Sequence, residues 1–291
     1  PYSCGYGALL RNHLRDRAAR GVQRLFNPGL KRRHGIPLPL NLARFRRRHD
    51  FEIVVPPRGD INDPEFIARL REEFRPTLAL SFFCVQRFAP ELLALFEQAV
   101  NYHNGRLPDY KGMRATAWSV YNGEERSGFA LHRMTAELDQ GDILIEDAIP
   151  IGPGDGVHDI EIEKALRAAR RMPELLGMVA DNTPGRPQEG AGRTFSDKRW
   201  KAARAVADPS ALTLDEFHRR LRAFGSLNLR IGGAWYPVTR IEEAAHGSRR
   251  PRELDFVTAD GLTVRPVRLR HLPQALYRFL GRFTRAAKQR T

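Results

Sequence analysis

The sequence predicts an α/β protein built on a doubly wound, mostly parallel sheet. Between residues 51 and 104, short apolar and β-branched runs typical of strands alternate with segments of helical periodicity. The run over 76–85, PTLALSFFCV, is almost continuously apolar, as expected of a central parallel strand that is covered on both faces. With 291 residues and 42% hydrophobic content, the chain can bury one large core or two ordinary ones.

In the first half of the chain, each predicted helix precedes a predicted strand. Asp63 is a good N-cap because Pro64 and Glu65 follow it in the first helical turn. The first helix should itself follow a strand that the sequence does not show, so we expect the first strand of the sheet to be missing. The predicted elements are a basic helix over 5–26, a strand over 51–57, a helix over 63–74, a strand over 76–85, a helix over 89–98 and a strand over 99–104.

The second half of the sequence predicts further strands of the same sheet, followed by a small β-containing domain. Thr213 and Glu216 have the spacing of a capping box, and Asp260-Gly261 is a strong signal for a hairpin turn. The predicted elements are a helix over 115–124, a strand over 128–134, a turn and strand over 139–151, helices over 154–172 and 213–224, and strands over 234–241 and 254–269. Pro and Gly are frequent in 180–193, so we divide the chain into a catalytic domain (1–180), a linker (181–195) and a small basic C-terminal domain (196–291).

Charge is distributed unevenly along the chain. The net charge is +14, with 12 Lys and Arg against 2 Asp and Glu in 1–50, 15 against 23 in 51–191 and 21 against 9 in 192–291. Basic flanks around an acidic middle indicate a polyanionic partner, such as a nucleic acid, a phosphorylated substrate or an anionic membrane surface. A solvated, Arg-rich surface is the alternative interpretation, and composition leaves both open.

Composition also argues against several classes of protein. Cys4 and Cys84 are the only cysteines, so we expect neither a disulfide framework nor a metal site. No apolar run is long enough to span a membrane and no secretory signal is visible, so we expect a cytoplasmic protein. The helix predicted near 272–288 has an apolar face that would allow weak contact with a membrane surface, or packing on its own domain.

Polar residues suited to catalysis gather at the end of the strand over 99–104. Asn101 and His103 occupy alternate positions, so both side chains face the same way, at the strand end where α/β sheets bind ligands. Asp139 follows 36 residues after His103. Asn as a donor, His as a base and Asp as the group that orients the His suit acyl transfer to an amine. No Ser or Cys is placed as a nucleophile, so direct transfer is the simpler mechanism.

A longer motif surrounds these residues. VNYHNGRLPDYKG (100–112), NGE (122–124) and SGFALHRMTAELDQGDILIE (127–146) together resemble the formyltransferases that use 10-formyltetrahydrofolate. This family acts on methionyl-tRNA, glycinamide ribonucleotide or amino sugars. Its members carry a strand-end Asn-x-His, a loop ending in Leu-Pro and an Asp-x-Gly on a later turn, and all of these are present here in order. The resemblance covers residues 50–180 best and implies a Rossmann-like fold.

The resemblance implies a role for each residue of the motif. Asn101 would donate a hydrogen bond to the oxyanion that forms when the acceptor amine attacks the formyl carbon. His103 would accept the amine's proton, directly or through water, and Asp139 would orient His103 and favour its protonated form. The folate co-substrate would lie against the loop after 76–85 and the 139–142 turn, and the implied contact residues are Phe83, Gln86, Phe88, Leu107, Gly141 and Asp142.

Two positions qualify the resemblance. Many family members have Ser-Leu-Leu-Pro after the His, whereas this chain has Asn-Gly-Arg-Leu-Pro, with Arg106 at an apolar position. This departure leaves the catalytic trio intact and concerns the loop's contacts with folate. His132 is interpreted as a strand residue beside the site, without a catalytic role.

The acceptor stays open between two classes. Residues after 192 faintly resemble the C-terminal domain of methionyl-tRNA formyltransferase, whereas LPDYKGMRATAWSVYNGE (107–124) resembles members that act on amino sugars or other small amines. A tRNA and a nucleotide- or lipid-linked amino sugar are all anionic, so charge does not separate them. Two alternatives are a non-catalytic formyltransferase-like module that binds nucleic acid through its basic flanks, and an unrelated α/β transferase that shares Asn-x-His by chance.

Overall fold

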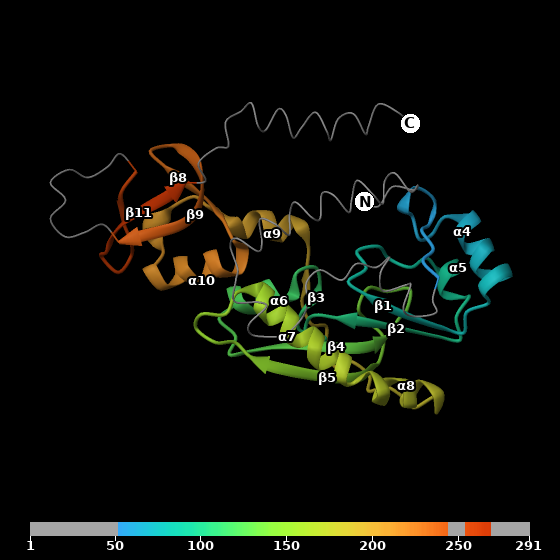
Figure 1. Ribbon diagram of the computed structural model, residues 1–291. Coiled ribbons are helices and arrows are strands. Elements are labelled where there is room, and N and C mark those ends of the chain that lie inside the picture. The colour runs from blue at the N-terminus through green and yellow to red at the C-terminus, as the bar shows by residue number, and fades with distance from the viewer. Residues whose placement is uncertain (1–51, 244–253, 269–291) are drawn as a thin grey trace. The chain divides into compact units, whose positions relative to one another are not determined.

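The computed structural model describes residues 52–243 and 254–268 (Figure 1). The helices predicted over 5–26 and near 272–288 lie outside these residues. Contacts between Cα atoms divide the chain into two compact units. Of the described residues, unit 1 holds 52–112, 127–150 and 158–194, and unit 2 holds 113–126, 151–157, 195–243 and 254–268.

Unit 1 is built on a four-stranded sheet with the order β1-β2-β4-β5. The strands are β1 (Leu78–Phe82), β2 (Gln98–His103), β4 (Arg126–Arg133) and β5 (Ile143–Pro150). β1 and β2 are parallel, whereas β2 and β4 are antiparallel, with Asn101 opposite His132. The described sheet is therefore mixed rather than mostly parallel. β1, predicted as a central strand, pairs with β2 alone among the described residues, and the full Rossmann-like arrangement stays a prediction.

The start of unit 1 differs from the sequence prediction. The strand predicted over 51–57 is wrong for the described residues 52–57, which form no strand. Pro56 and Pro57 have no N–H to donate to a sheet, and Pro57–Gly59 form a 3₁₀ turn, η1. The predicted cap of the next helix, α4 (Pro64–Arg69), is confirmed, because the Asp63 carboxylate accepts a hydrogen bond from the Glu65 N–H at 3.0 Å.

Besides α4, the described part of unit 1 contains three further helices and two short segments. α4 continues into the π-helical turn η2 (Leu70–Phe74), and α5 (Pro90–Leu93) is shorter than the predicted 89–98. The single helix predicted over 154–172 ends at Arg170, and a second helix begins at Met172 with Pro173 in its first turn. These helices are α7 (Val157–Arg170) and α8 (Met172–Ala180), and the short strand β3 (Lys111–Gly112) lies between β2 and β4 in sequence.

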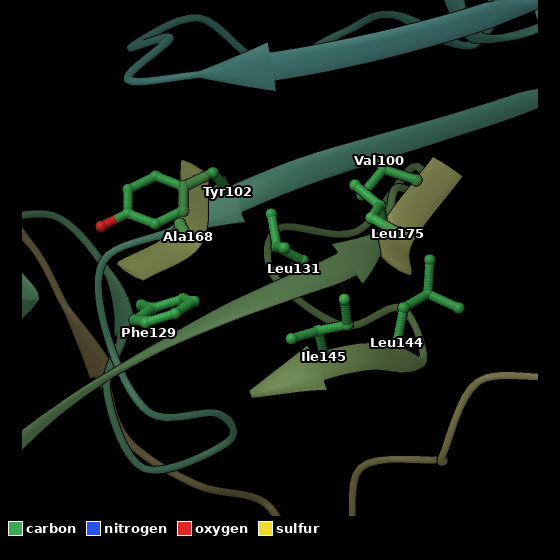
Figure 2. Packing of buried hydrophobic residues seen from close by; sticks show 8 residues of the cluster. All are labelled: Val100, Tyr102, Phe129, Leu131, Leu144, Ile145, Ala168 and Leu175. Atoms are coloured by element: carbon green, nitrogen blue, oxygen red, sulfur yellow. The ribbon is translucent and has the colours of Figure 1, made fainter. Parts of the chain in front are cut away.

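The two faces of the unit 1 sheet differ in chemistry. One face packs against α7 and α8, and Figure 2 shows side chains from β2, β4 and β5 converging there. This cluster consists of Val100, Tyr102, Phe129, Leu131, Leu144, Ile145, Ala168 and Leu175. Because side chains alternate along a strand, Asn101, His103 and His132 point to the opposite face. Burial of the apolar face therefore fixes the register that aligns these polar side chains.

Unit 2 combines a five-stranded sheet with helices and an aromatic cluster. Its sheet has the order β10-β11-β9-β8-β7. In the aromatic cluster, the ring centroid of Trp118 lies 4.7 Å from that of Phe195, and the ring of Phe224 lies 4.6 Å from that of Trp200. The elements are α6 (Ala115–Tyr121), β6 (Thr194–Phe195), α9 (Asp197–Arg204), β7 (Ala205–Val206), η3 (Pro209–Ala211), α10 (Leu214–Phe224), β8 (Leu227–Ile231), β9 (Ala234–Glu243), β10 (Phe256–Val257) and β11 (Thr263–Arg268).

Two local predictions in unit 2 are confirmed. Thr213 and Glu216 form a reciprocal capping box at the start of α10, with each backbone N–H donating to the other residue's side chain. β10 and β11 pair as an antiparallel hairpin across the Asp260-Gly261 turn, where Gly261 has a φ of 81°.

The predicted linker over 181–195 lies mostly within unit 1. The backbone of Arg186 exchanges two hydrogen bonds of 2.8 Å with Ile143, and the Lys111 N–H donates to the Arg193 carbonyl at 2.9 Å. These contacts return the chain to β5 and β3 after α8. The domain boundaries themselves stay a prediction.

Candidate functional site

β2 brings Asn101 and His103 to one face of the unit 1 sheet, at the carboxyl end of the strand. In the antiparallel pairing with β4, His132 lies opposite Asn101 and Ala130 lies opposite His103. The small residue Ala130 therefore lies beside His103, and the polar residue His132 lies beside Asn101. Asp139 comes from the turn that joins β4 to β5.

The His103 imidazole is buried and faces oxygen atoms at both ring nitrogens. Its Nε2 lies 2.6 Å from the Tyr110 carbonyl, which can only accept, so Nε2 carries a proton. Its Nδ1 lies 3.5 Å from Asp139 Oδ2. Burial lowers the pKa of His103 below its ordinary value, and this outweighs the nearby Asp139 carboxylate and Tyr110 carbonyl, which favour the charged ring.

The Asp139 carboxylate is buried between two imidazoles. Its Oδ2 accepts a hydrogen bond from the Gly112 N–H at 2.7 Å, and its Oδ1 lies 3.6 Å from His132 Nε2. Burial alone would raise the pKa of this carboxyl, but the nearby His103 ring and the Gly112 N–H lower it below its usual range. Asp139 is therefore an anion at neutral pH and favours the positively charged form of His103.

His132 is the site residue that the sequence analysis did not assign to the chemistry. Its Nδ1 donates to the Arg133 carbonyl at 2.8 Å, which leaves the Nε2 lone pair to accept from the Asn101 amide at 3.2 Å. This contact turns the Nδ2 of Asn101, rather than its Oδ1, toward His132. The alternating pattern of 128–134 already placed His132 on one face of a strand, but the pairing with Asn101 needed the sheet.

Three predicted folate-contact residues lie on the loop between β1 and α5. Phe83 is exposed, has a φ of 54°, and its ring centroid lies 5.3 Å from that of Tyr102. Tyr102 points to the face opposite Asn101 and His103, so Phe83 packs on that side. Gln86 donates to the Gly59 carbonyl at 2.7 Å and accepts from the Ile61 N–H at 3.1 Å, and Phe88 is half-buried. Their roles in folate binding stay predictions.

The other three predicted contact residues lie near the trio. Leu107 is buried and packs with Ala130 and Ile143. Gly141 passes so close to the Arg133 carbonyl that a Cβ would lie 1.9 Å from its oxygen, so this position excludes every other residue. Asp142 continues the turn, and its carbonyl accepts a hydrogen bond from the Arg133 N–H at 2.9 Å. These two contacts therefore restrict the backbone conformation of the turn beside the site.

Within 52–243 and 254–268, no group of three or more His, Cys, Asp or Glu side chains is arranged to hold a metal ion. No helix in this part of the chain is long and apolar enough to cross a membrane.

Several known formyltransferases resemble this chain. Residues 33–176 match the family model described as formyl transferase. GDP-perosamine N-formyltransferase from Brucella melitensis is 29% identical over 174 residues, which cover 58% of this chain and 66% of that protein. Methionyl-tRNA formyltransferase from Bordetella petrii is 32% identical over 145 residues, which cover 48% of this chain and 44% of that protein.

A solved structure supports the likeness at the level of fold. The sugar 3N-formyltransferase WlaRD, solved with dTDP and 5-N-formyl-THF, aligns with a TM-score of 0.54 and 19% identity, over 79% of this chain and 82% of that one. The match to the curated relatives is shorter, because the chain spans less than two thirds of their length.

Proposed function

Because the chain belongs to the formyl transferase family, we propose that it moves a formyl group from 10-formyltetrahydrofolate to an acceptor amine by direct attack. The observation that carries the proposal is the meeting of Asn101, His103 and Asp139 on one face of the sheet. His103 Nδ1 lies 3.5 Å from Asp139 Oδ2, and His132 Nε2 lies 3.2 Å from Asn101 Nδ2 and 3.6 Å from Asp139 Oδ1. The amine nitrogen forms a bond to the formyl carbon, the bond from that carbon to the folate nitrogen then breaks, and tetrahydrofolate leaves with a proton on that nitrogen. The chain supplies orientation, charge stabilisation and acceptance of the proton that the amine loses.

Asn101 is proposed as the donor to the oxygen that becomes negative when the amine adds to the formyl carbon. An Asn amide has two N–H groups, and one of them is held by His132 Nε2 at 3.2 Å. The second N–H is then fixed in direction, which allows it to meet the developing oxyanion without reorganisation. Loss of one such donor typically lowers the rate by about 100- to 1000-fold.

His103 is proposed as the base. Because burial lowers its pKa, the ring is neutral at physiological pH and can accept a proton. Nε2 already donates to Tyr110, so the proton lost by the amine would arrive at Nδ1, beside Asp139 Oδ2. Turnover should fall as the pH decreases through the lowered pKa of His103, because the protonated ring cannot act as a base.

The acceptor is proposed to be an amino sugar linked to a nucleotide or a lipid, with methionyl-tRNA as the second candidate. The alignment with the perosamine enzyme is longer than that with methionyl-tRNA formyltransferase, at 174 against 145 residues. The aligned structural relative is also a sugar formyltransferase. Both acceptor classes are anionic, which agrees with the net charge of +14.

The test is formyl transfer from 10-formyltetrahydrofolate to a panel of acceptors: 3-amino and 4-amino nucleotide sugars, methionyl-tRNA and small amines. Purified protein is compared with His103→Ala and with His158→Ala, which removes an exposed histidine from α7. Turnover on one acceptor that is lost in His103→Ala and kept in His158→Ala supports the proposal. Folate binding and turnover that are both absent would contradict it, and salt-dependent RNA binding in their place would favour the non-catalytic module.

A further inference from the structure

The segment that follows α8 returns to the site instead of leaving unit 1. We call residues 186–193 the strap. At one end, Arg186 exchanges backbone hydrogen bonds with Ile143, and at the other end the Arg193 N–H donates to the Pro108 carbonyl at 3.2 Å. Gly192, with a φ of 63°, passes Pro108 so closely that a Cβ would lie 2.0 Å from its carbonyl oxygen. The strap is thus attached to both segments that flank the trio, the loop after β2 and the turn before β5.

Gln188 connects the middle of the strap to the backbone of the Asp139 turn. Its Nε2 donates to the Asp139 carbonyl at 2.9 Å and to the Gly141 carbonyl at 2.8 Å. Carbonyl oxygens only accept hydrogen bonds, so the nitrogen of the Gln188 amide must face both of them. This fixes the orientation of the amide group. Its Oε1 is buried and has no hydrogen-bond partner among the described residues. The two donated hydrogen bonds therefore account for the position of the Gln188 side chain, although its acceptor oxygen is unpaired.

Lys111 forms a second, independent link between the strap and the turn. Its side chain is buried, and its Nζ donates to Gln140 Oε1 at 2.9 Å and to the Ala191 carbonyl at 3.0 Å. The turn needs such support because Asp139 has a φ of 53°, a left-handed conformation that residues other than glycine adopt at a cost. Gln188 of the strap and Lys111 therefore contact three residues of the turn, Asp139, Gln140 and Gly141.

We propose that Gln188 is a positioning residue for Asp139, and that the strap belongs to the catalytic apparatus rather than to a linker. By fixing the carbonyls of Asp139 and Gly141, Gln188 sets where the Asp139 carboxylate lies between His103 and His132. The carboxylate then meets the Gly112 N–H at 2.7 Å and the two rings at 3.5 and 3.6 Å. The expected effect on the rate of catalysis rests on the formyl transfer proposed above, whereas the expected effect on the titration of the His103 ring does not.

Removal of the two donated hydrogen bonds has a defined effect on His103. A carboxylate near an imidazole favours the protonated ring, so a displaced Asp139 lowers the pKa of His103. The expected change is a downward shift of about half a pH unit or more in the titration of the His103 ring. The maximal rate kcat should fall about tenfold, because His103 loses its support at the moment of proton acceptance, while KM changes little.

The experiment compares Gln188→Met with Gln98→Met. Gln98, on β2, also donates to a carbonyl, that of Val179 at 2.7 Å, and accepts from Arg133, so the control removes an equivalent amide from the same unit. The ring titration of His103 is followed by NMR, and kcat and KM are measured on the acceptor that the panel identifies. A shift in the ring titration with a fall in kcat for Gln188→Met alone supports the proposal.

An unchanged titration in a folded Gln188→Met protein would overturn it. A second variant, Gln188→Leu, also removes both donated hydrogen bonds without adding a charge and should shift the titration in the same direction; wild-type behaviour there would also overturn the proposal. The NMR readout does not depend on turnover. If the wild-type protein fails with every acceptor, the formyl transfer fails, while the ring titration still decides whether Gln188 positions Asp139.

Discussion

Units 1 and 2 place their charged side chains in opposite ways. Among the described residues, the acidic and basic residues that are buried as a whole lie in unit 1, and these are Asp63, His103, Lys111, His132, Asp139 and Lys164. The polar residues of unit 2 that are buried as a whole carry hydroxyl groups, at Thr116, Ser119 and Thr258, and its buried Asp255 carboxylate is paired with Arg265 at 2.8 Å. Arginines of unit 2 lie over aromatic rings instead, as where the Arg199 guanidinium sits 4.9 Å from the Phe195 ring centroid.

This difference separates the part of the chain organised for chemistry from the part organised for packing. A buried ionisable group costs several kcal/mol unless hydrogen bonds or an opposite charge offset the loss of water. Unit 1 accepts that cost around the carboxyl end of β2, where His103, His132 and Asp139 interact. Unit 2 buries rings and keeps its many cations near the surface, so we expect its residues to determine stability more than the chemical step.

The largest expected effect on stability is in the core of unit 2. Phe217, on α10, is 0% exposed, and its ring centroid lies 5.6 Å from that of Phe256. Phe217→Ala should lower the free energy of unfolding by about 3–5 kcal/mol, because the lost ring leaves a cavity. Urea unfolding measures the change, with Trp235→Ala, which removes a ring that is 50% exposed, as the control. Equal losses in the two variants would contradict the importance of buried rings in unit 2.

The largest expected effect on turnover is at Asn101. Asn101→Ala should lower kcat about 100- to 1000-fold, which corresponds to about 2.7–4 kcal/mol of activation free energy, because the donor to the oxyanion is lost. Steady-state kinetics measure it, with Asn228→Ala as the control, since Asn228 is an exposed residue on β8 of unit 2. A full rate in Asn101→Ala would remove Asn101 from the mechanism and weaken the contrast between the units.

Lys164 tests the cost of buried charge in unit 1 through pH. Its Nζ donates to the Asn104 and Gly128 carbonyls at 2.6 and 3.1 Å, and burial lowers its pKa to about 7, against a nearby Glu161 that raises it. The unfolded chain has a Lys pKa of about 10.4, so above pH 7 the folded state binds fewer protons than the unfolded state. The stability of the wild-type protein should therefore rise with pH between about 7 and 10, relative to Lys164→Met, by up to about 1.4 kcal/mol per pH unit.

Urea unfolding at several pH values measures this difference, and Lys201→Met, which removes an exposed lysine of unit 2, should show no such trend. Below pH 7 the lysine is protonated in both states, so the difference between wild type and Lys164→Met should become constant. A difference that stays constant from pH 7 to 10 would show that Lys164 remains charged when buried.

The smallest expected effect is at the capping box of α10. Thr213 Oγ1 accepts from the Glu216 N–H at 3.2 Å, and Glu216 Oε2 accepts from the Thr213 N–H at 3.0 Å. Thr213→Ala should lower the free energy of unfolding by about 1 kcal/mol. Because the two side chains act on each other's backbone, the effects of Thr213→Ala and Glu216→Ala should not add, which a double-mutant cycle measures. Strict additivity would contradict a reciprocal box.

Local signals in the sequence predicted local structure well. The caps at Asp63 and Thr213 and the hairpin at Asp260-Gly261 depend on residues within a few positions of each other, and all of them are confirmed. The alternation of a strand likewise placed Asn101 and His103 on one face. The strand predicted over 51–57 failed because its β-branched residues precede two prolines without N–H donors, and strand formation requires a partner that propensity does not supply.

Relations between distant segments were decided by the tertiary structure. The sequence by itself determined which residues could do chemistry, such as Asn101, His103 and Asp139, because residue type and periodicity are properties of the sequence alone. The antiparallel pairing that sets His132 against Asn101, and the return of the strap that sets Gln188 against the Asp139 turn, join residues 31 and 49 positions apart. Such contacts form when the chain buries its apolar side chains and pairs its backbone N–H and C=O groups at the same time. No local sequence pattern encodes which distant segment will supply the partner.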